Sequence, residues 1–242
     1  MKAMILAAGK GTRLRPLTEQ LPKCMVRVQG KPILDHTIEW LKKYKVRDLI
    51  INLHHFPRVI SDYFGDGKER GVRITYSFEP EVLGTAGAVR KVRECFEDAF
   101  FLWYGDNLST CDLRQLYRFH RAKGGIATVA LFRREDVSQS GIAELNAGKR
   151  VTRFLEKPRP HESFSRLVNA GIMVLEPRIF EFIPESGRPD FGHDVFPALL
   201  ASGEAIFGYE MLGGEGLWWI DTPDDLRRVQ GEWSKGGEND PR

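Results

Sequence analysis

Short apolar runs alternate with helix-period segments along the first half of this 242-residue chain. Apolar runs of about four to eight residues predict buried strands, whereas apolar residues that recur every three or four positions predict helices packed on a sheet. The strands are predicted at residues 3–8, 48–53, 73–78 and 99–104, and the helices at residues 33–44, 56–64 and 85–96. Strands that alternate with helices predict an α/β fold, with a mostly parallel, Rossmann-like sheet in a three-layer arrangement.

The second half of the chain has a looser pattern, which predicts a smaller lobe of mixed α+β structure. Its strands are predicted at residues 126–132, 142–145, 150–155, 168–175 and 205–211, and its helices at residues 113–122, 177–182, 194–201 and 224–233. The strands at 142–145 and 150–155 form a predicted hairpin. We therefore expect a single domain over residues 1–233, made of lobes at 1–111 and 112–233, and a disordered tail at 234–242.

The first predicted strand ends in a glycine-rich turn that is followed by basic residues. Gly9 and Gly11 permit positive φ and lack a Cβ, so successive backbone N–H groups can converge on an anion. The loop that follows carries three cationic side chains, Arg13, Arg15 and Lys23. Guanidinium and ammonium groups bind phosphate, and arginine can do so with two parallel hydrogen bonds. The turn is therefore predicted to bind a polyphosphate.

Two well-known phosphate loops do not fit this turn. The dinucleotide fingerprint G-x-G-x-x-G needs glycine where the chain has Leu14, and the Walker A loop G-x-x-x-x-G-K-[ST] cannot be formed from Gly9 and Gly11. The chain reads G-x-G-T-R instead, followed by Pro16-Leu17-Thr18 and Pro22-Lys23. This order resembles the opening signature of the sugar-phosphate nucleotidylyltransferases, L-A-G/A-G-x-G-T-R-L-x-P-L-T followed by P-K.

The resemblance extends from Met1 to about Val229 and implies roles for residues in both lobes. It implies a nucleotide-binding lobe at 1–111 and a sugar-phosphate-binding lobe at 112–233, with Arg13, Lys23 and Asp106 as catalytic residues. The residues that it assigns to the nucleotide are Leu6, Ala8, Gly9, Gly11, Thr12, Arg13, Glu79, Gly84 and Thr85. Those that it assigns to the sugar phosphate are Gly141, Glu156, Lys157, Asn169 and Gly171, partly in E-K-P and N-A-G motifs.

Two aspartates are candidate ligands for Mg²⁺. This ion arrives with a nucleoside triphosphate and prefers one or two carboxylates together with phosphate oxygens and water. Taken alone, Asp106 could be a turn residue at a strand end, and Asp221 could be the N-cap of the last predicted helix. The resemblance implies instead that both bind magnesium, in a G-D and a W-x-D motif. The family pattern W-x-D-x-G-T-P is shortened here, because Thr222-Pro223 follows Asp221 directly.

Glu79 and residues 83–87 are candidates for recognition of the base. The helix predicted near Thr85 would offer free backbone N–H groups and the positive end of its dipole, and Gly84 would let a flat base approach the backbone. An ionised Glu79 suits guanine, whose N1–H and N2 amino group are adjacent donors, whereas uracil and thymine present one N3–H between two carbonyls. The alternative is that Glu79, which precedes Pro80, is a solvated loop acid. The side chain itself favours GTP.

Composition and charge argue against several classes of function. The net charge is +3 and no long run of Lys and Arg occurs, which argues against nucleic-acid or membrane binding. The three cysteines are odd in number and lack CxxC spacing, so neither a disulfide framework nor a zinc site is predicted. We expect Cys24 to pack, since no histidine partner is indicated, and the six histidines to be structural.

The chain shows no signal-peptide pattern and no apolar run of membrane-spanning length. We therefore expect a cytoplasmic protein, monomeric or homodimeric, without an appended acyltransferase or hexapeptide-repeat domain.

The sequence thus predicts transfer of a nucleotidyl group from a nucleoside triphosphate to a sugar 1-phosphate, with release of pyrophosphate. The main expectation is GTP with mannose 1-phosphate or a related sugar, and the alternative is a thymidylyl- or uridylyltransferase that acts on another sugar 1-phosphate. A metal-dependent glycosyltransferase is less favoured, because such enzymes typically carry Asp-x-Asp where this chain has Gly105-Asp106-Asn107. A silent regulatory subunit is also less favoured, since the candidate site residues are all retained.

Overall fold

The computed structural model describes residues 1–236, which divide into two compact units. Unit 1 comprises Met1–Glu81, Tyr104–Cys111 and the chain from Gly214 onward, and unit 2 comprises Val82–Trp103 and Asp112–Gly213. The units interleave along the chain, so their boundaries do not coincide with the predicted lobes at 1–111 and 112–233. The single domain and the functions assigned to the lobes stay predictions.

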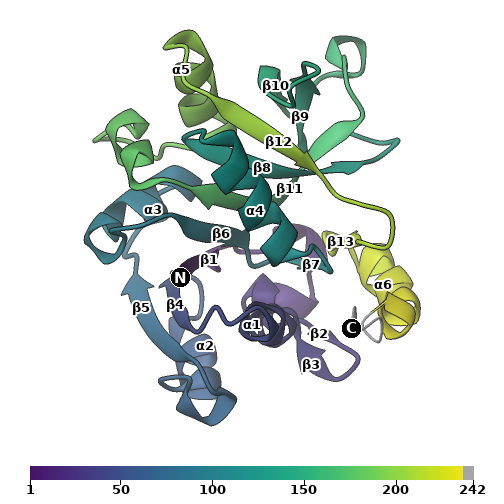
Figure 1. The fold of residues 1–242 in the computed structure, drawn as a ribbon. Coiled ribbons are helices and arrows are strands. Elements are labelled where there is room, and N and C mark those ends of the chain that lie inside the picture. The colour runs from purple at the N-terminus through teal and green to yellow at the C-terminus, as the bar shows by residue number, and fades with distance from the viewer. Residues whose placement is uncertain (237–242) are drawn as a thin grey trace. The chain divides into compact units, whose positions relative to one another are not determined.

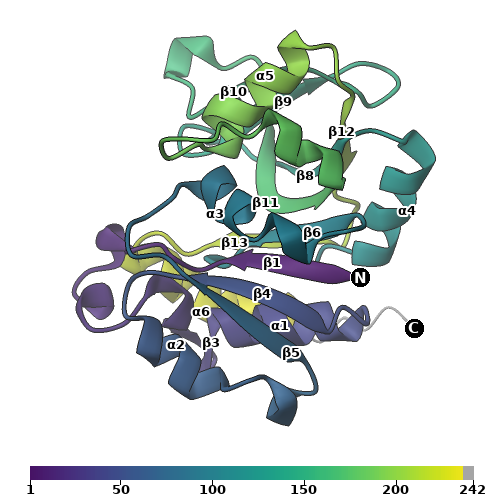
Figure 2. The same cartoon turned by 90° about the vertical axis from the view of Figure 1, so that its left-hand side faces the viewer.

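Unit 1 is built on three parallel strands, β1 (Lys2–Leu6), β4 (Asp48–Leu53) and β5 (Arg73–Phe78), which Figure 2 shows side by side. In register, Leu6 pairs with Asn52 and Asn52 pairs with Ser77. The carboxyl ends of the three strands therefore lie at one edge of this sheet. The helices α1 (Ile33–Lys43) and α2 (Pro57–Phe64) also belong to this unit.

Two short antiparallel ribbons and the last helix complete unit 1 (Figure 1). One ribbon pairs β2 (Arg27–Val28) with β3 (Lys31–Pro32), and the other pairs β7 (Asn107–Ser109) with β13 (Leu217–Trp219). A single buried cluster contains Leu14 of the glycine-rich loop, Leu108 of β7 and Val229 of helix α6 (Pro223–Gly236). Burial of apolar side chains thus joins three segments of unit 1 that lie far apart in the sequence.

Unit 2 contains a mixed sheet in which antiparallel pairs dominate. Its strands are β6 (Phe100–Tyr104, whose last residue belongs to unit 1), β8 (Ala127–Arg133), β9 (Gly141–Leu145), β10 (Val151–Glu156), β11 (Leu167–Leu175) and β12 (Ile206–Glu210). Strand β11 runs antiparallel to β6, β8 and β9, β10 runs antiparallel to β9, and β12 runs parallel to β8. Its α-helices are α3 (Thr85–Lys91), α4 (Leu113–Lys123) and α5 (Phe196–Ala201).

The predicted α/β class with a Rossmann-like parallel sheet is confirmed, and most helix and strand positions agree. Helix α3 is shorter than predicted, because Val92 leaves helical geometry with φ −112° and a 3₁₀ turn, Arg93–Cys95, follows. The predicted helix at 177–182 is a 3₁₀ segment, and the one at 194–201 begins with a π-helical turn, Phe191–Val195. Other 3₁₀ turns span Thr12–Leu14, Leu17–Glu19, Lys23–Met25, Lys68–Arg70 and Pro160–Glu162.

The predicted disordered tail at 234–242 is wrong for residues 234–236, which continue helix α6. No helix breaker stands between Trp233 and Gly236, so the i→i−4 hydrogen-bond pattern carries on to that glycine. Residues 237–242 lie outside the described residues. Within the described part of the chain, no helix combines the length and the apolar character needed to cross a membrane.

Candidate functional site

The glycine-rich loop after β1 packs closely on the buried stem of Lys23. Gly11 adopts φ +61°, and a Cβ at this position would lie 2.7 Å from Cβ of Lys23. The Gly11 carbonyl accepts hydrogen bonds from Oγ1 of Thr18 at 2.7 Å and from the backbone N–H of Leu14 at 2.9 Å. Only glycine therefore satisfies both the backbone angle and the close approach.

Four of the predicted site residues in unit 1 are linked by ion pairs: two aspartates bind the ammonium group of Lys23, and Arg13 binds one of these aspartates. Nζ of Lys23 lies 2.7 Å from Oδ2 of Asp106 and 2.6 Å from Oδ1 of Asp221. Nη2 of Arg13 lies 3.0 Å from the same oxygen of Asp221. The Lys23 side chain is only 8% exposed, whereas that of Arg13 is 54% exposed. The structure thus gathers side chains from three distant stretches of sequence.

The β7–β13 ribbon explains how the two aspartates meet. Trp219 pairs with Asn107 in register across the ribbon. Asp106 directly precedes β7, and Asp221 follows two residues after Trp219. A few antiparallel hydrogen bonds therefore bring together two carboxylates that are far apart in the chain.

The shortened loop after Asp221 is closed by the N-terminal cap of helix α6. Oδ2 of Asp225 accepts hydrogen bonds from the backbone N–H groups of Asp221 at 3.2 Å and Thr222 at 2.9 Å. In return, the N–H of Asp225 donates to Oγ1 of Thr222 at 3.1 Å. This reciprocal cap fixes the backbone of Asp221 without the additional residues of the family pattern.

The electrostatics of the loop make Lys23 a stable cation and Cys24 an inert thiol. Burial disfavours the charge on Lys23, but the attraction of Asp106 and Asp221 outweighs it and raises the pKa of the ammonium above its ordinary value. Burial, reinforced by Asp106, raises the pKa of Cys24 to about 12. Cys24 is 2% exposed, so the expectation that it packs is confirmed.

The pair of aspartates fits a small, hard cation. Among the described residues, no group of three or more His, Cys, Asp or Glu side chains could hold a metal ion. Asp106 and Asp221 nevertheless reach the same cationic group, so their oxygens lie within range of one ion. Two carboxylates with room for phosphate oxygens and water are the donor set that Mg²⁺ favours. The residues present therefore fit magnesium better than zinc.

Glu79 is a buried member of a hydrogen-bond chain at the carboxyl ends of β1, β4 and β5. The Asn52 side chain accepts from the N–H of Ala7 at 2.7 Å and donates to Oε1 of Glu79 at 2.8 Å. The backbone carbonyl of Glu79 also contacts Nδ1 of His54 at 2.9 Å. Because Glu79 is 1% exposed, the alternative of a solvated loop acid is wrong.

The expectation of free N–H groups at the start of α3 is also wrong. The backbone N–H groups of Ala86 and Gly87 both donate to the carbonyl of Pro189, at 3.0 and 3.2 Å. Gly84, with φ +79°, permits this contact, since a Cβ there would lie 2.5 Å from the same carbonyl oxygen. Thr85 donates from Oγ1 to Oδ2 of Asp190 at 2.7 Å. These residues anchor the loop at 188–190 within unit 2.

The predicted sugar-phosphate residues lie together at one end of β9, β10 and β11. Glu156 pairs with Gly141 across β9 and β10, and Val168, next to Asn169, pairs with Ile142. A Cβ at Gly141 would lie 2.5 Å from Oε2 of Glu156, so the absence of a side chain makes room for this carboxylate.

The Glu156 carboxylate is enclosed from a second side by the π-helical turn. A Cβ at Gly192 would lie 2.4 Å from Oε2 of Glu156. Burial, followed by the charge of Asp190, raises the pKa of Glu156 above its ordinary value. A poorly solvated carboxylate of this kind gains from hydroxyl donors on a ligand.

The N-A-G motif lies at an irregularity of strand β11, where the register with β8 shifts between Asn169 and Met173. Gly171 adopts φ +71°, and its N–H donates to Oδ1 of Asn169 at 2.8 Å. The side-chain oxygen of Asn169 therefore accepts a hydrogen bond from the backbone. The NH₂ group of the same side chain is the donor that it can offer a ligand. Lys157 adopts φ +48°, an uncommon angle for a residue with a side chain, and its N–H donates to the Ser140 carbonyl at 3.2 Å.

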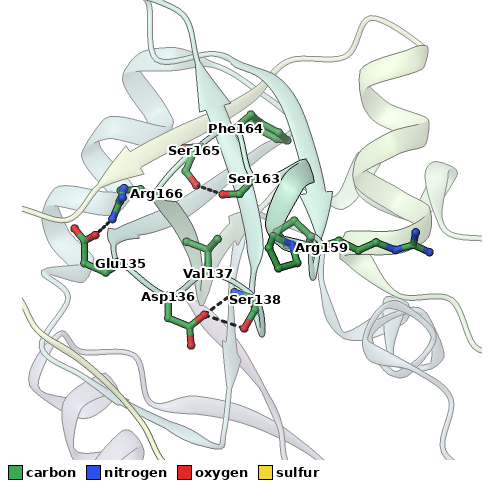
Figure 3. A pocket seen from close by; sticks show the side chains of 11 residues that line it. Glu135, Asp136, Val137, Ser138, Arg159, Ser163, Phe164, Ser165 and Arg166 are labelled. Carbon is green, nitrogen blue, oxygen red and sulfur yellow. Dashed lines mark hydrogen bonds and ion pairs between the residues drawn. The ribbon is translucent and has the colours of Figure 1, made fainter.

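A cavity of about 600 Å³ lies elsewhere in unit 2 (Figure 3). None of the five predicted sugar-phosphate residues lines it, although Pro158 directly follows Lys157. Two of its carboxylates already have partners in the lining, since Glu135 forms an ion pair with Arg166 and Asp136 accepts a hydrogen bond from Oγ of Ser138 at 2.8 Å. The cavity therefore adds no side chain to the candidate site.

Sequence reasoning missed three residues that hold the site in shape, namely Asn52, Asp190 and Asp225. Asn52 is 3% exposed and lies one residue before the end of β4, whose other buried residues are apolar, so its polarity at that position was an available signal. The carboxylates of Asp190 and Asp225 each accept hydrogen bonds from backbone N–H groups at the start of a helical segment, and an aspartate at such a position is the signature of that role.

Comparisons with known proteins identify the family to which the chain belongs. The family model described as nucleotidyl transferase matches residues 2–231. The chain belongs to this nucleotidyl transferase family, which confirms the resemblance found in its sequence.

Two curated relatives illustrate the range of the family. The chain is 36% identical to a UTP–glucose-1-phosphate uridylyltransferase of Synechocystis sp. and 35% identical to a mannose-1-phosphate guanylyltransferase of Mycobacterium tuberculosis. The matches cover 99% and 97% of this chain but only 65% of either relative. The chain thus spans about two thirds of the length of these relatives.

A solved structure shares the fold. It is a protein of Bacillus anthracis provisionally named glucose-1-phosphate thymidylyltransferase, in complex with sucrose. It matches with a TM-score of 0.87 and 24% identity, over 99% of this chain and 96% of that one.

Proposed function

We propose that this protein transfers a nucleotidyl group from a nucleoside triphosphate to a sugar 1-phosphate. The observation that carries the proposal is the convergence of Arg13, Lys23, Asp106 and Asp221 in unit 1. A phosphate oxygen of the sugar 1-phosphate forms a bond to the α-phosphorus, and the bond from that phosphorus to the bridging oxygen of pyrophosphate breaks. The products are a nucleotide sugar and pyrophosphate.

The catalytic demand is electrostatic rather than acid–base. A phosphate monoester has its second pKa near about 6, so the nucleophile is already anionic at neutral pH and needs no general base. Arg13 stabilises the negative charge on the leaving pyrophosphate, and Lys23 binds on the side of the α-phosphate. Asp106 and Asp221 would hold Mg²⁺, which supplies charge neutralisation to the phosphates when it is bound.

Unit 2 supplies the groups for the sugar phosphate. Lys157 binds the incoming phosphate, and Glu156 and Asn169 bind sugar hydroxyls beside the backbone of Gly141 and Gly171. The enclosed carboxylate of Glu156 and the NH₂ group of Asn169 support this assignment, because one accepts and the other donates hydrogen bonds.

For the substrates, we propose GTP with mannose 1-phosphate or a related sugar. Glu79 supports guanine because a carboxylate can accept hydrogen bonds from adjacent donors on the base, and Asn52 orients this one. Since Glu79 is 1% exposed, the strand end must open to admit the base. The similarity to the guanylyltransferase of M. tuberculosis supports the same choice. The second candidate is UTP with glucose 1-phosphate, which the equally similar Synechocystis relative favours.

The test is a comparison of charge-removing variants in the same loop. Purified Arg13→Ala and Asp106→Ala are assayed for pyrophosphate release from GTP and mannose 1-phosphate, and from UTP and glucose 1-phosphate. We expect both variants to lose activity by a factor of about 10² or more while their circular dichroism stays that of the wild type. Lys10→Ala is the matched control, because Lys10 is an exposed cation in the same loop. Wild-type rates in Arg13→Ala or Asp106→Ala would refute the proposal.

A further inference from the structure

Lys23 occupies the place between the two carboxylates where a divalent ion would bind. Its Nζ lies 2.7 Å from Oδ2 of Asp106 and 2.6 Å from Oδ1 of Asp221, both within the distance of a charge-assisted hydrogen bond. The Lys23 side chain is 8% exposed, whereas those of Asp106 and Asp221 are 42% and 21% exposed. The ammonium is thus buried on the protein side, while both carboxylates are partly exposed to solvent, and each has an oxygen paired with the ammonium.

This arrangement conflicts with the arrangement needed for transfer. Catalysis requires Asp106 and Asp221 to face a metal ion and Lys23 to face a phosphate. Oδ1 of Asp221 already accepts both the Lys23 ammonium and the Arg13 guanidinium. A divalent ion bound to the same carboxylate oxygens carries twice the charge, and the buried ammonium beside it would be strongly repelled. The ammonium must therefore leave before or while the ion enters.

The geometry of Lys23 allows its ammonium to move while its stem stays fixed. A Cβ on Gly11 would lie 2.7 Å from Cβ and 3.2 Å from Cγ of Lys23, so the inner part of the side chain packs against the loop. Rotation about the outer bonds moves Nζ without moving the backbone. Once it leaves the carboxylates, the buried ammonium needs a new anionic partner, and a phosphate group of the nucleotide can supply it.

We propose that Lys23 is a placeholder cation, which keeps the two carboxylates paired and closed to metal until a nucleoside triphosphate arrives with its ion. Binding of the ion to Asp106 and Asp221 and binding of phosphate to Lys23 then depend on each other. By linkage, each raises the affinity for the other by the same factor. The inference rests on the proposed function, but its test needs neither nucleotide nor turnover.

The test measures binding of Mn²⁺, a paramagnetic substitute for Mg²⁺, to the full-length protein without nucleotide. The electron paramagnetic resonance signal of free Mn²⁺ reports how much of the ion is bound. We expect weak binding to the wild type and binding to Lys23→Gln that is tighter by about tenfold or more, because the competing charge is gone. The double variant Lys23→Gln/Asp106→Asn also lacks one metal ligand, so we expect it to lose the increase in Mn²⁺ affinity.

Two single variants separate the placeholder role from a general effect of charge. Lys10→Gln removes one positive charge from the same loop and is expected to bind Mn²⁺ as the wild type does. Lys23→Arg keeps a cation at the position and is expected to bind Mn²⁺ weakly. The inference is overturned if Lys23→Gln binds Mn²⁺ no more tightly than Lys10→Gln, or if the wild type binds as tightly as Lys23→Gln.

Thermal unfolding provides a second readout in case Lys23→Gln is unstable. Without the ammonium, the two carboxylates repel, so this variant should melt several degrees below the wild type, and Mn²⁺ should raise its melting temperature. A Lys23→Gln protein that Mn²⁺ does not stabilise would contradict the inference. If Lys23→Gln binds Mn²⁺ more tightly than the wild type does, but the wild type forms no nucleotide sugar, the proposed function fails and the placeholder role stands.

Discussion

At the scale of single residues, the site depends on close approach as much as on charge. Gly11 lets the stem of Lys23 pack against the loop, and Gly141 and Gly192 leave the space that Glu156 fills. The sequence predicted Gly11 as an anion-binding residue, but the contact that requires glycine there is with a lysine side chain. Such contacts depend on how separate segments pack in the fold. A sequence motif can therefore show that glycine is needed at a position without showing which contact requires it.

Gly11→Ala tests this requirement. The added Cβ meets Cβ of Lys23 at 2.7 Å, and the left-handed φ of +61° is strained for alanine. We expect the free energy of unfolding to fall by about 1–3 kcal/mol and activity to fall with it. Urea denaturation measures the first effect. Gly9→Ala is the control, because nothing lies within 4 Å of its added Cβ, and equal stability losses in the two variants would refute the packing argument.

Cysteine reactivity tests the burial of the thiol beside Lys23. Cys24 has a pKa of about 12 and is buried, as is Cys111, while Cys95 is half-buried. At pH 8, we expect a chromogenic disulfide reagent to label Cys95 in the native protein and all three thiols after denaturation. Mass spectrometry of the labelled peptides identifies the sites. Fast native labelling of Cys24 would contradict the burial and the protonation assigned to it.

At the scale of elements, the ends of strands carry the site. The chain of hydrogen bonds from Ala7 through Asn52 to Glu79 crosses β1, β4 and β5, and the β7–β13 ribbon places both aspartates. The sequence predicted the long strands because their apolar runs are unambiguous. It missed β7 and β13, since three-residue strands are too short to show a period.

Glu79→Gln tests whether this strand end selects the base. The amide oxygen can still accept from Asn52, but an NH₂ donor replaces the second acceptor oxygen that adjacent donors on guanine need. We expect the ratio of kcat/KM for GTP to that for UTP to fall by about 10- to 100-fold. Parallel steady-state assays with both nucleotides give the ratio. An unchanged ratio would exclude Glu79 as the selective group.

Helix α4 provides a pH-dependent contribution to stability. His120 is 1% exposed, contacts Oγ1 of Thr128 at 2.9 Å, and has its pKa lowered mainly by burial. Below about pH 6.5, the unfolded chain takes up a proton that the folded chain resists, so the free energy of unfolding decreases as the pH falls.

The variant His120→Gln removes this proton uptake. We expect its free energy of unfolding to decline less steeply than that of the wild type between pH 7.5 and about pH 5.5. Urea denaturation at several pH values supplies the slopes. His161→Gln, at an exposed histidine, should keep the wild-type slope. Identical slopes in His120→Gln and the wild type would contradict the assignment.

At the scale of the whole molecule, the family and the fold class could be predicted but the compact units could not. The ordered motif from Gly9 to Lys23 identifies the family, and alternating strands and helices identify the class. The units interleave because residues 104–111 and the segment from Gly214 onward return to unit 1. Apolar contacts, such as those of Leu108 and Val229 in one buried cluster, hold these segments in unit 1. Contacts between segments so far apart in the chain cannot be predicted from local sequence patterns.

We propose that the cations and carboxylates gathered around Lys23 allow a nucleotidyl group to pass to a sugar 1-phosphate. The most direct test incubates the wild-type protein with Mg²⁺, each of GTP, UTP, dTTP, CTP and ATP, and each of mannose, glucose and heptose 1-phosphates. Pyrophosphate is then measured. We expect pyrophosphate only when a triphosphate and a sugar 1-phosphate are both present, and fastest with GTP and mannose 1-phosphate. Absence of pyrophosphate from every pair would contradict it.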